Sequence, residues 1–217
     1  GRMHLSAEDT DLARLIALLH DIGRFEQLKR YDSFEPGTMD HAAYGVKVLF
    51  DEGMIRRFLP DDKWDSIIYT AIAHHSDYEL PEISDPQTLL HAKLIRDEDK
   101  LDNCRVKLVD STSTFINVSE EELGTQNITQ KVYETVFENK CILSADRVTQ
   151  MDYWVSYIVY FFDINFKESF DIIAENDYLN RIIDRIPYSN PVTKEQMENI
   201  RVYMQNFINS HTNSQSF

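Results

Sequence analysis

Histidine and aspartate residues gather in four short clusters in the first half of the chain. The clusters are His20-Asp21, Asp40-His41, His74-His75 and the segment that contains Asp99. Imidazole and carboxylate groups without thiolates suit Mn, Fe, Co, Ni, Zn or Mg rather than copper(I). Successive clusters are 21 to 33 residues apart, so each can come from a separate helix of one bundle. The spacing therefore predicts a site for one or two divalent metal ions among helices.

The pair His20-Asp21 is the most informative cluster because it ends a strongly apolar helix, in which Ala17, Leu18 and Leu19 precede it. Burying an adjacent imidazole and carboxylate without partners would be costly, and a metal ion would satisfy both. In the alternative, His20 caps its helix and Asp21 accepts a hydrogen bond from a backbone amide. The other three clusters favour the metal site over this alternative.

Helical spacing of apolar residues predicts the elements that carry these clusters. Ser6 is a candidate N-cap, and one apolar stripe follows it before Gly23. The polar stretch 27–38, with Pro36-Gly37, predicts a loop. Further helices are expected from Asp40 to near Gly53, from Asp61 to His75, and from Pro86 through Asp99.

The second half predicts more helices and carries no motif. Residues 112–127 are polar and predict a loop or lid, and helices are expected at about 128–140, 144–163 and 165–186. A last helix is expected to open with a capping box at Thr193. The fold is therefore predicted to be all-α: a helical metal-binding domain over 1–125, and a helical extension over 126–217 that packs on it.

Composition excludes several functional classes. The net charge of −15 is unsuited to a nucleic-acid duplex, which needs a basic face, and to an anionic membrane surface. Two cysteines allow no disulfide scaffold, and the most apolar run, Tyr153 to Phe162, is too short to span a bilayer. We expect a cytoplasmic protein. The spacing of that run favours core packing, within one chain or at a homodimer interface, over base stacking.

Three motifs resemble those of one family. Leu18-Leu19-His20-Asp21-Ile22-Gly23-Arg24, Ala73-His74-His75 and Asp99-Lys100-Leu101-Asp102 resemble the signatures of the HD-domain metal-dependent phosphohydrolases, in the same order. The resemblance covers about residues 1–105 and implies an all-helical fold that cleaves phosphate esters or anhydrides.

The resemblance also implies roles for the clustered residues. His20, Asp21 and Asp99 would hold a first metal ion. In two-metal members such as the HD-GYP phosphodiesterases, the positions of His41, His74 and His75 hold a second ion that Asp21 bridges. The Gly-Tyr-Pro element is absent after His41, where Ala42-Ala43-Tyr44-Gly45 stands, and this argues against a cyclic-dinucleotide substrate. The family takes a further histidine from an upstream helix, which we expect before residue 1, since His4 is too close to His20.

Three more residues are candidates for catalysis beside Asp21. Arg24 lies one turn after His20 and Lys100 lies beside Asp99, so both are placed to contact phosphate oxygens. Asp102 is three residues after Asp99 on one helical face, where it would orient a ligand or accept a proton. The alternative is a set of surface salt bridges.

The sequence leaves three hypotheses for function. The first is a metal-dependent phosphohydrolase that acts on a small phosphorylated substrate, with nucleotides as the leading class. The second is a regulatory module of the same architecture that binds metal and nucleotide without turnover. The third is a structural helical protein whose His/Asp clusters are incidental.

Overall fold

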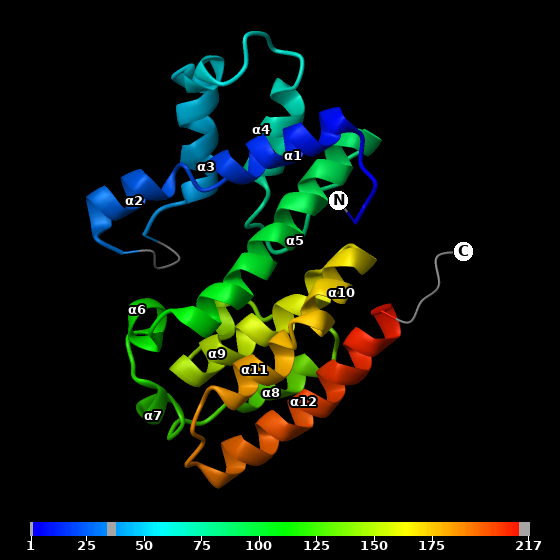
Figure 1. Ribbon diagram of the computed structural model, residues 1–217. Helices are drawn as coiled ribbons and strands as arrows, with labels where there is room; N and C mark the ends of the chain where they lie inside the picture. Colours follow the sequence, from blue (N-terminus) through cyan, green and yellow to red (C-terminus); the bar gives the residue numbers. More distant parts are fainter. Residues whose placement is uncertain (1, 34–37, 213–217) are drawn as a thin grey trace. The chain divides into compact units, whose positions relative to one another are not determined.

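A computed structural model of the chain describes residues 2–33 and 38–212, and these residues form helices and connections with no β-strand. Figure 1 shows this all-α architecture, which confirms the predicted fold class. The chain divides into two compact units, Gly1–Asp99 and Lys100–Phe217. The boundary falls inside one long helix, α5 (Pro86–Val109), whereas the division drawn from the sequence is at residue 125.

Among its described residues, the N-terminal unit contains six helical segments before α5. They are α1 (Ala7–Leu19), α2 (Arg24–Tyr31), α3 (His41–Val46) with its π-helical continuation η1 (Lys47–Asp51), η2 (Met54–Arg57) and α4 (Asp65–Ala73). Side chains cap two of them as the sequence predicts. Ser6 accepts a hydrogen bond from the Asp9 amide at 3.0 Å, and Asp40 accepts one from the Ala43 amide at 2.9 Å. Each cap satisfies a backbone donor that the first helical turn leaves without a partner.

The helix α2 corrects the loop predicted for residues 27–38. The chain remains helical to Tyr31, where an ion pair between Glu26 and Arg30 at 2.7 Å spans one turn. The helix ends at Asp32, which has a left-handed backbone with φ of 47°. Pro36-Gly37 lies outside the described residues.

The core of the N-terminal unit is built where the apolar stripes of α1, α3, α4 and α5 meet. Ile16 of α1, Leu49 of η1 and Ile68 of α4 are all 1% exposed or less. Ile95 brings α5 into the same cluster. Because these stripes fix the facing sides of the helices, they also fix which residues at the helix ends can approach one another.

The C-terminal unit contains the rest of α5 and a series of further helices. They are α6 (Thr112–Ile116), α7 (Glu120–Leu123), α8 (Gln130–Val136), η3 (Ser144–Asp146), α9 (Gln150–Val159), η4 (Tyr160–Asp163), α10 (Lys167–Glu175), α11 (Tyr178–Asp184) and α12 (Pro191–Thr212). The stretch predicted as a loop or lid thus contains two short helices. The side-chain cap of α12 is Asn190, whose Oδ1 accepts a hydrogen bond from the Val192 amide at 3.0 Å. The capping box predicted at Thr193 is wrong, because the Thr193 hydroxyl donates to the Gln126 carbonyl.

A large apolar core fills the C-terminal unit. Trp154 is fully buried and stacks near Phe115, with ring centroids 6.3 Å apart. The aromatic run identified in the sequence therefore packs inside this core, as α9 and η4. Among the described residues, no helix has the combination of length and apolar character that crossing a membrane requires.

Candidate metal centre

Three imidazoles converge on the carboxylate of Asp21 in the N-terminal unit. The Nε2 atoms of His41 and His75 lie 3.3 and 3.6 Å from Asp21 Oδ1, and His20 Nε2 lies 3.7 Å from Asp21 Oδ2. The Nε2 atoms of His41 and His75 are 3.1 Å apart. The helix ends that the sequence singles out thus bring their polar side chains into one small volume.

Asp99 supplies the second carboxylate of this cluster from α5. Its Oδ1 lies 3.8 Å from His20 Nε2. The rings of His20 and His41 each meet the His75 ring edge to face, with centroid distances of 5.0 Å. We call His20, Asp21, His41, His75 and Asp99 the His/Asp cluster.

Backbone carbonyls fix which ring nitrogen of two histidines carries a proton. His20 Nδ1 donates to the Ala17 carbonyl at 2.8 Å, and His75 Nδ1 donates to the Ile72 carbonyl at 2.7 Å. In the neutral rings the proton is therefore on Nδ1, and each Nε2 presents a lone pair to the cluster. This orientation by a second hydrogen bond is typical of metal-ligating histidines.

Gly23 allows the elements that carry the cluster to approach closely. A Cβ atom at this position would lie only 2.0 Å from the His41 carbonyl oxygen and 2.8 Å from the Gly45 amide nitrogen. The turn after His20-Asp21 therefore packs directly on the backbone of α3. Any side chain at residue 23 would push His41 away from Asp21.

The charges of the cluster favour ionised carboxylates. Burial alone would raise the pKa of Asp21, but the facing His41 and His75 imidazoles and the charge of Arg24 bring it well below its usual range. Burial likewise opposes ionisation of Asp99, and the neighbouring His20 imidazole lowers its pKa. Burial disfavours the His20 imidazolium, yet Asp99 and Asp21 raise the pKa of His20.

The donor set fits a divalent cation. Asp21 Oδ1 is buried and accepts no well-formed hydrogen bond from the described residues, although two Nε2 atoms face it. His75 Nε2 and the Asp21 oxygens are acceptors that point at each other, which is unfavourable without a proton or a cation between them. Ligand atoms of His20, Asp21 and His75 lie within 4.8 Å of one another. Imidazole and carboxylate ligands of this kind suit Mn, Fe, Zn, Co, Ni or Mg.

Comparison with protein-family models gives a match to the N-terminal part of the chain. Residues 2–104 match the model of the HD domain. The chain carries an HD domain. This confirms the resemblance noted in the sequence, and it places the domain in a superfamily of metal-dependent hydrolases whose members bind divalent metals. Comparisons with curated proteins and with solved structures give no match.

Each of the remaining predicted site residues pairs with a nearby charged side chain in the structure. His74 Nδ1 lies 2.6 Å from Asp77 Oδ2, and the Arg24 Nε donates to Asp21 Oδ2 at 2.8 Å. In the C-terminal unit, Lys100 Nζ pairs with Asp163 at 2.7 Å, and Asp102 is exposed and pairs with Arg105. The metal role of His74 and the catalytic roles of Arg24, Lys100 and Asp102 stay predictions.

Two residues that contact the His74-His75 turn were not among the sequence candidates. Asp77 pairs with His74 from three residues away, a spacing that the sequence shows but does not distinguish from a solvated charge. Arg96 is only 2% exposed and donates to backbone carbonyls of the turn after His75. A lone arginine near the middle of a helix gives no sequence signal, because its partners are backbone atoms about 20 residues earlier.

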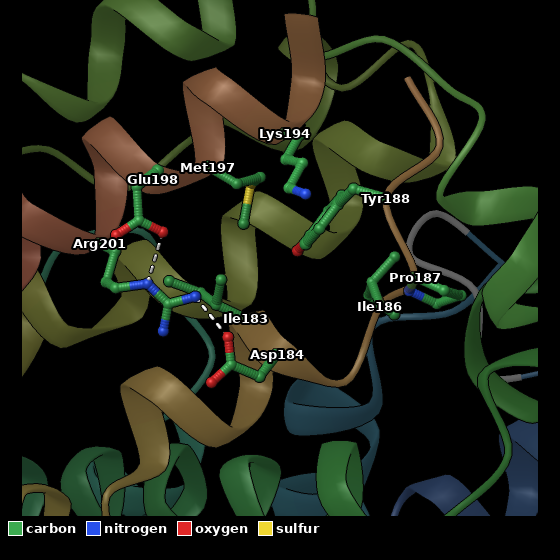
Figure 2. Close-up of a pocket in the computed structure, with 9 residues that line it drawn as sticks. All are labelled: Ile183, Asp184, Ile186, Pro187, Tyr188, Lys194, Met197, Glu198 and Arg201. Atoms are coloured by element: carbon green, nitrogen blue, oxygen red, sulfur yellow. Dashed lines mark hydrogen bonds and ion pairs between the residues drawn. The ribbon is translucent and has the colours of Figure 1, made fainter. Parts of the chain in front are cut away.

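The C-terminal unit has a separate pocket of about 510 Å³ between α11, the connection after it and α12. Figure 2 shows Lys194, Met197 and Tyr188 around this pocket, and Arg201 held by Glu198 and Asp184. None of the residues predicted for the metal site lines it.

Proposed function

We propose that this chain is a metal-dependent phosphohydrolase that cleaves a phosphate ester or anhydride of a small phosphorylated substrate, with nucleotides as the leading class. The single observation that carries the proposal is the convergence of His20, His41 and His75 on Asp21, with Asp99 at His20. The proposed site requires all of these ligands, which come from four separate elements of an HD domain.

The protein residues of the site would bind the metal ion, orient the ligand atoms toward it and neutralise charge on the phosphate. A bound divalent ion would supply a water of lowered pKa and positive charge near the phosphate oxygens. His20 and His75, held by the carbonyls of Ala17 and Ile72, would keep their Nε2 lone pairs aimed at that ion. Asp21, with oxygens facing both His20 and the His41/His75 pair, would be a ligand shared by two ions in a two-metal site.

Arg24 is the residue we propose for phosphate binding. Its side chain is about one-third exposed and already pairs with Asp21, so the guanidinium lies at the edge of the His/Asp cluster. An arginine fork matches two oxygens of a phosphoryl group. Phosphoryl transfer depends mainly on such positioning and charge neutralisation. Lys100 and Asp102 are proposed as secondary contacts to substrate or ligands.

The experiment starts with the full chain, purified and analysed for bound metals. The metal-free protein is then loaded with Mn²⁺ and assayed with an aryl phosphate monoester, the corresponding diester and a panel of nucleoside mono-, di- and triphosphates. The organic product separates the two reactions: a free nucleoside indicates ester cleavage, and a nucleotide with fewer phosphates indicates anhydride cleavage. We expect metal-dependent turnover of at least one of these substrates.

The variant Asp21→Asn tests the site within this experiment, because it removes the bridging charge and keeps the side-chain volume. We expect it to abolish turnover while helical content stays unchanged. The matched control is Asp11→Asn, an exposed aspartate of α1 that pairs with exposed Arg14, and it should retain full activity. Turnover that survives Asp21→Asn would refute the site. Metal and nucleotide binding without turnover would favour the regulatory module.

A further inference from the structure

Arg96 is a buried cation whose guanidinium binds the backbone of one turn. Its Nη1 donates to the carbonyls of His74 at 3.0 Å and Asp77 at 2.7 Å, and lies 3.4 Å from that of His75. Its Nη2 donates to the Tyr78 carbonyl at 3.3 Å. A side chain that is 2% exposed therefore contacts four carbonyls within five consecutive residues.

This turn follows the C-terminus of α4, where carbonyl groups have no helical partners. A cation at a helix C-terminus is also favoured by the helix dipole. The planar guanidinium donates in several fixed directions, so it can hold several carbonyls at once, whereas an ammonium is a compact point charge. The shape of residues 74–78 is thus set by a side chain from α5.

The same turn contains His75, whose side chain is 1% exposed and whose Nε2 lies 3.6 Å from Asp21 Oδ1. The ring is oriented by the Ile72 carbonyl on one side, and the backbone of His75 is held by the Arg96 contacts on the other. Asp99, one turn after Arg96 on α5, reaches His20. One helix therefore supplies a carboxylate to the cluster and fixes the backbone of a histidine in it.

We propose that Arg96 is a positioning residue of the metal centre: it holds the turn 74–78 so that His75 points its Nε2 at Asp21. The inference rests on the proposed function, since it assumes that the His/Asp cluster binds metal. Arg96 acts through the backbone of His75 and touches neither metal nor substrate. Its loss should weaken metal binding through misplacement of one ligand.

The test is a double-mutant cycle between Arg96 and His75, read as the Kd for Mn²⁺ by calorimetry on the metal-free full chain. We expect Arg96→Lys to weaken Mn²⁺ binding at least about tenfold, the effect typical of losing a residue that orients a ligand. In a His75→Ala background, Arg96→Lys should weaken binding no further, because its effect passes through the missing ring. Arg14→Lys on the exposed face of α1 is the matched control and should bind as wild type.

Folding of each variant is checked by helical content and thermal unfolding. If Arg96→Lys does not fold, Arg96→Gln, which keeps an amide donor and buries no charge, takes its place in the cycle. In Arg96→Ala, added guanidinium at sub-denaturing concentration should recover part of the lost Mn²⁺ affinity, and sodium at equal ionic strength should not.

The outcomes separate this inference from the proposed function. Wild-type affinity in folded Arg96→Lys, or an equal loss of affinity with and without the His75 ring, would overturn the positioning role alone. Failure of the wild-type chain to bind Mn²⁺ would overturn the proposed function together with the inference.

Discussion

Two aspartates, one in each unit, show opposite uses of a buried carboxylate oxygen. Asp152 of α9 is fully buried, and its oxygens accept from the backbone amides of Thr129 at 2.8 Å and of Val148 and Thr149 at 3.0 Å. Asp21 has one oxygen bonded to Arg24, while its buried Oδ1 faces two imidazoles without a well-formed hydrogen bond. The first carboxylate is satisfied by its own fold, and the second is the one that the proposed metal ion would satisfy.

Several buried hydroxyls of the C-terminal unit are paired with backbone groups, as Asp152 is. In the C-terminal unit, the buried hydroxyls of Thr112, Ser156 and Thr193 each donate to a backbone carbonyl. In the N-terminal unit, polar atoms of the His/Asp cluster face one another. Buried polar groups are normally paired, and sites that break this rule are expected where function requires it. The comparison therefore predicts that Asp152 contributes mainly to stability and Asp21 mainly to the proposed metal site.

The largest expected effect is on the free energy of unfolding when each of the two aspartates is replaced. Asp152→Ala leaves three backbone amides without an acceptor and should lower the free energy of unfolding by about 3–5 kcal/mol. Asp21→Ala in metal-free protein should lower it by clearly less than Asp152→Ala does, because the Asp21 side chain is 38% exposed and its pair with Arg24 is screened by solvent. Urea denaturation followed by circular dichroism gives both values.

Asp184→Ala is the control for this pair of variants, because Asp184 is exposed and pairs with Arg201. It should stay close to wild type in stability. A loss of stability in metal-free Asp21→Ala equal to that in Asp152→Ala would show that Asp21 is structural, and the contrast between the units would fail.

The sequence was sufficient to predict the helices that carry a capping residue or an apolar stripe. Ser6 and Asp40 cap their helices as predicted, and the apolar stripes of α1 and α4 lie in the core. These features depend on residues within one or two turns of each other. The helix α2 was missed because its polar sequence lacks an apolar stripe, and its stability comes from the Glu26–Arg30 pair and from Gln27, which donates to Thr38 outside the helix.

The sequence identified the clusters but not how each histidine is used. It cannot separate His74 from His75, since both follow α4 directly. In the structure His75 faces Asp21 and His74 pairs with Asp77, and Arg96 holds the turn 74–78 that contains both histidines. In the same way, the pairing of Lys100 with Asp163 joins residues 63 positions apart. Such contacts depend on tertiary packing rather than on local spacing.

Metal binding should produce the next largest effect, and it should be confined to the N-terminal unit. At a free Mn²⁺ concentration 100 times the Kd, binding to the folded state alone adds about 2.7 kcal/mol. Hydrogen exchange measured by mass spectrometry should show slower exchange in peptides from α1, α3 and α4. Peptides from the α9 core should exchange at the same rate with and without the ion.

Two variants make this metal prediction specific. Asp152→Ala should retain the added protection in the N-terminal peptides, while Asp21→Asn should lose it. Equal protection of both units by Mn²⁺ would contradict the separation of roles between them.

The smallest effect is a pH dependence that changes sign with metal. The pKa of His20 is raised above 6.5 in the folded chain, so protonated His20 stabilises the metal-free fold below pH 6.5, and this contribution is lost as the pH rises through the folded pKa. Asp21 and Asp99 have lowered pKa values, and their contribution is present above their ordinary pKa of 3.8 and is lost as the pH falls further. Metal-free protein should therefore be most stable between these limits.

With Mn²⁺ present, the trend above pH 6.5 should reverse, because the ion needs a deprotonated imidazole and competes with the His20 proton. Thermal unfolding with Mn²⁺ and with a chelator, at one pH below 6.5 and one well above it, measures the difference. The stabilisation by the ion should be larger at the higher pH, and His20→Gln should remove most of that pH dependence while leaving the C-terminal unit unchanged. A metal effect independent of pH would mean that His20 does not bind the ion, and the cluster would then have to be assigned without it.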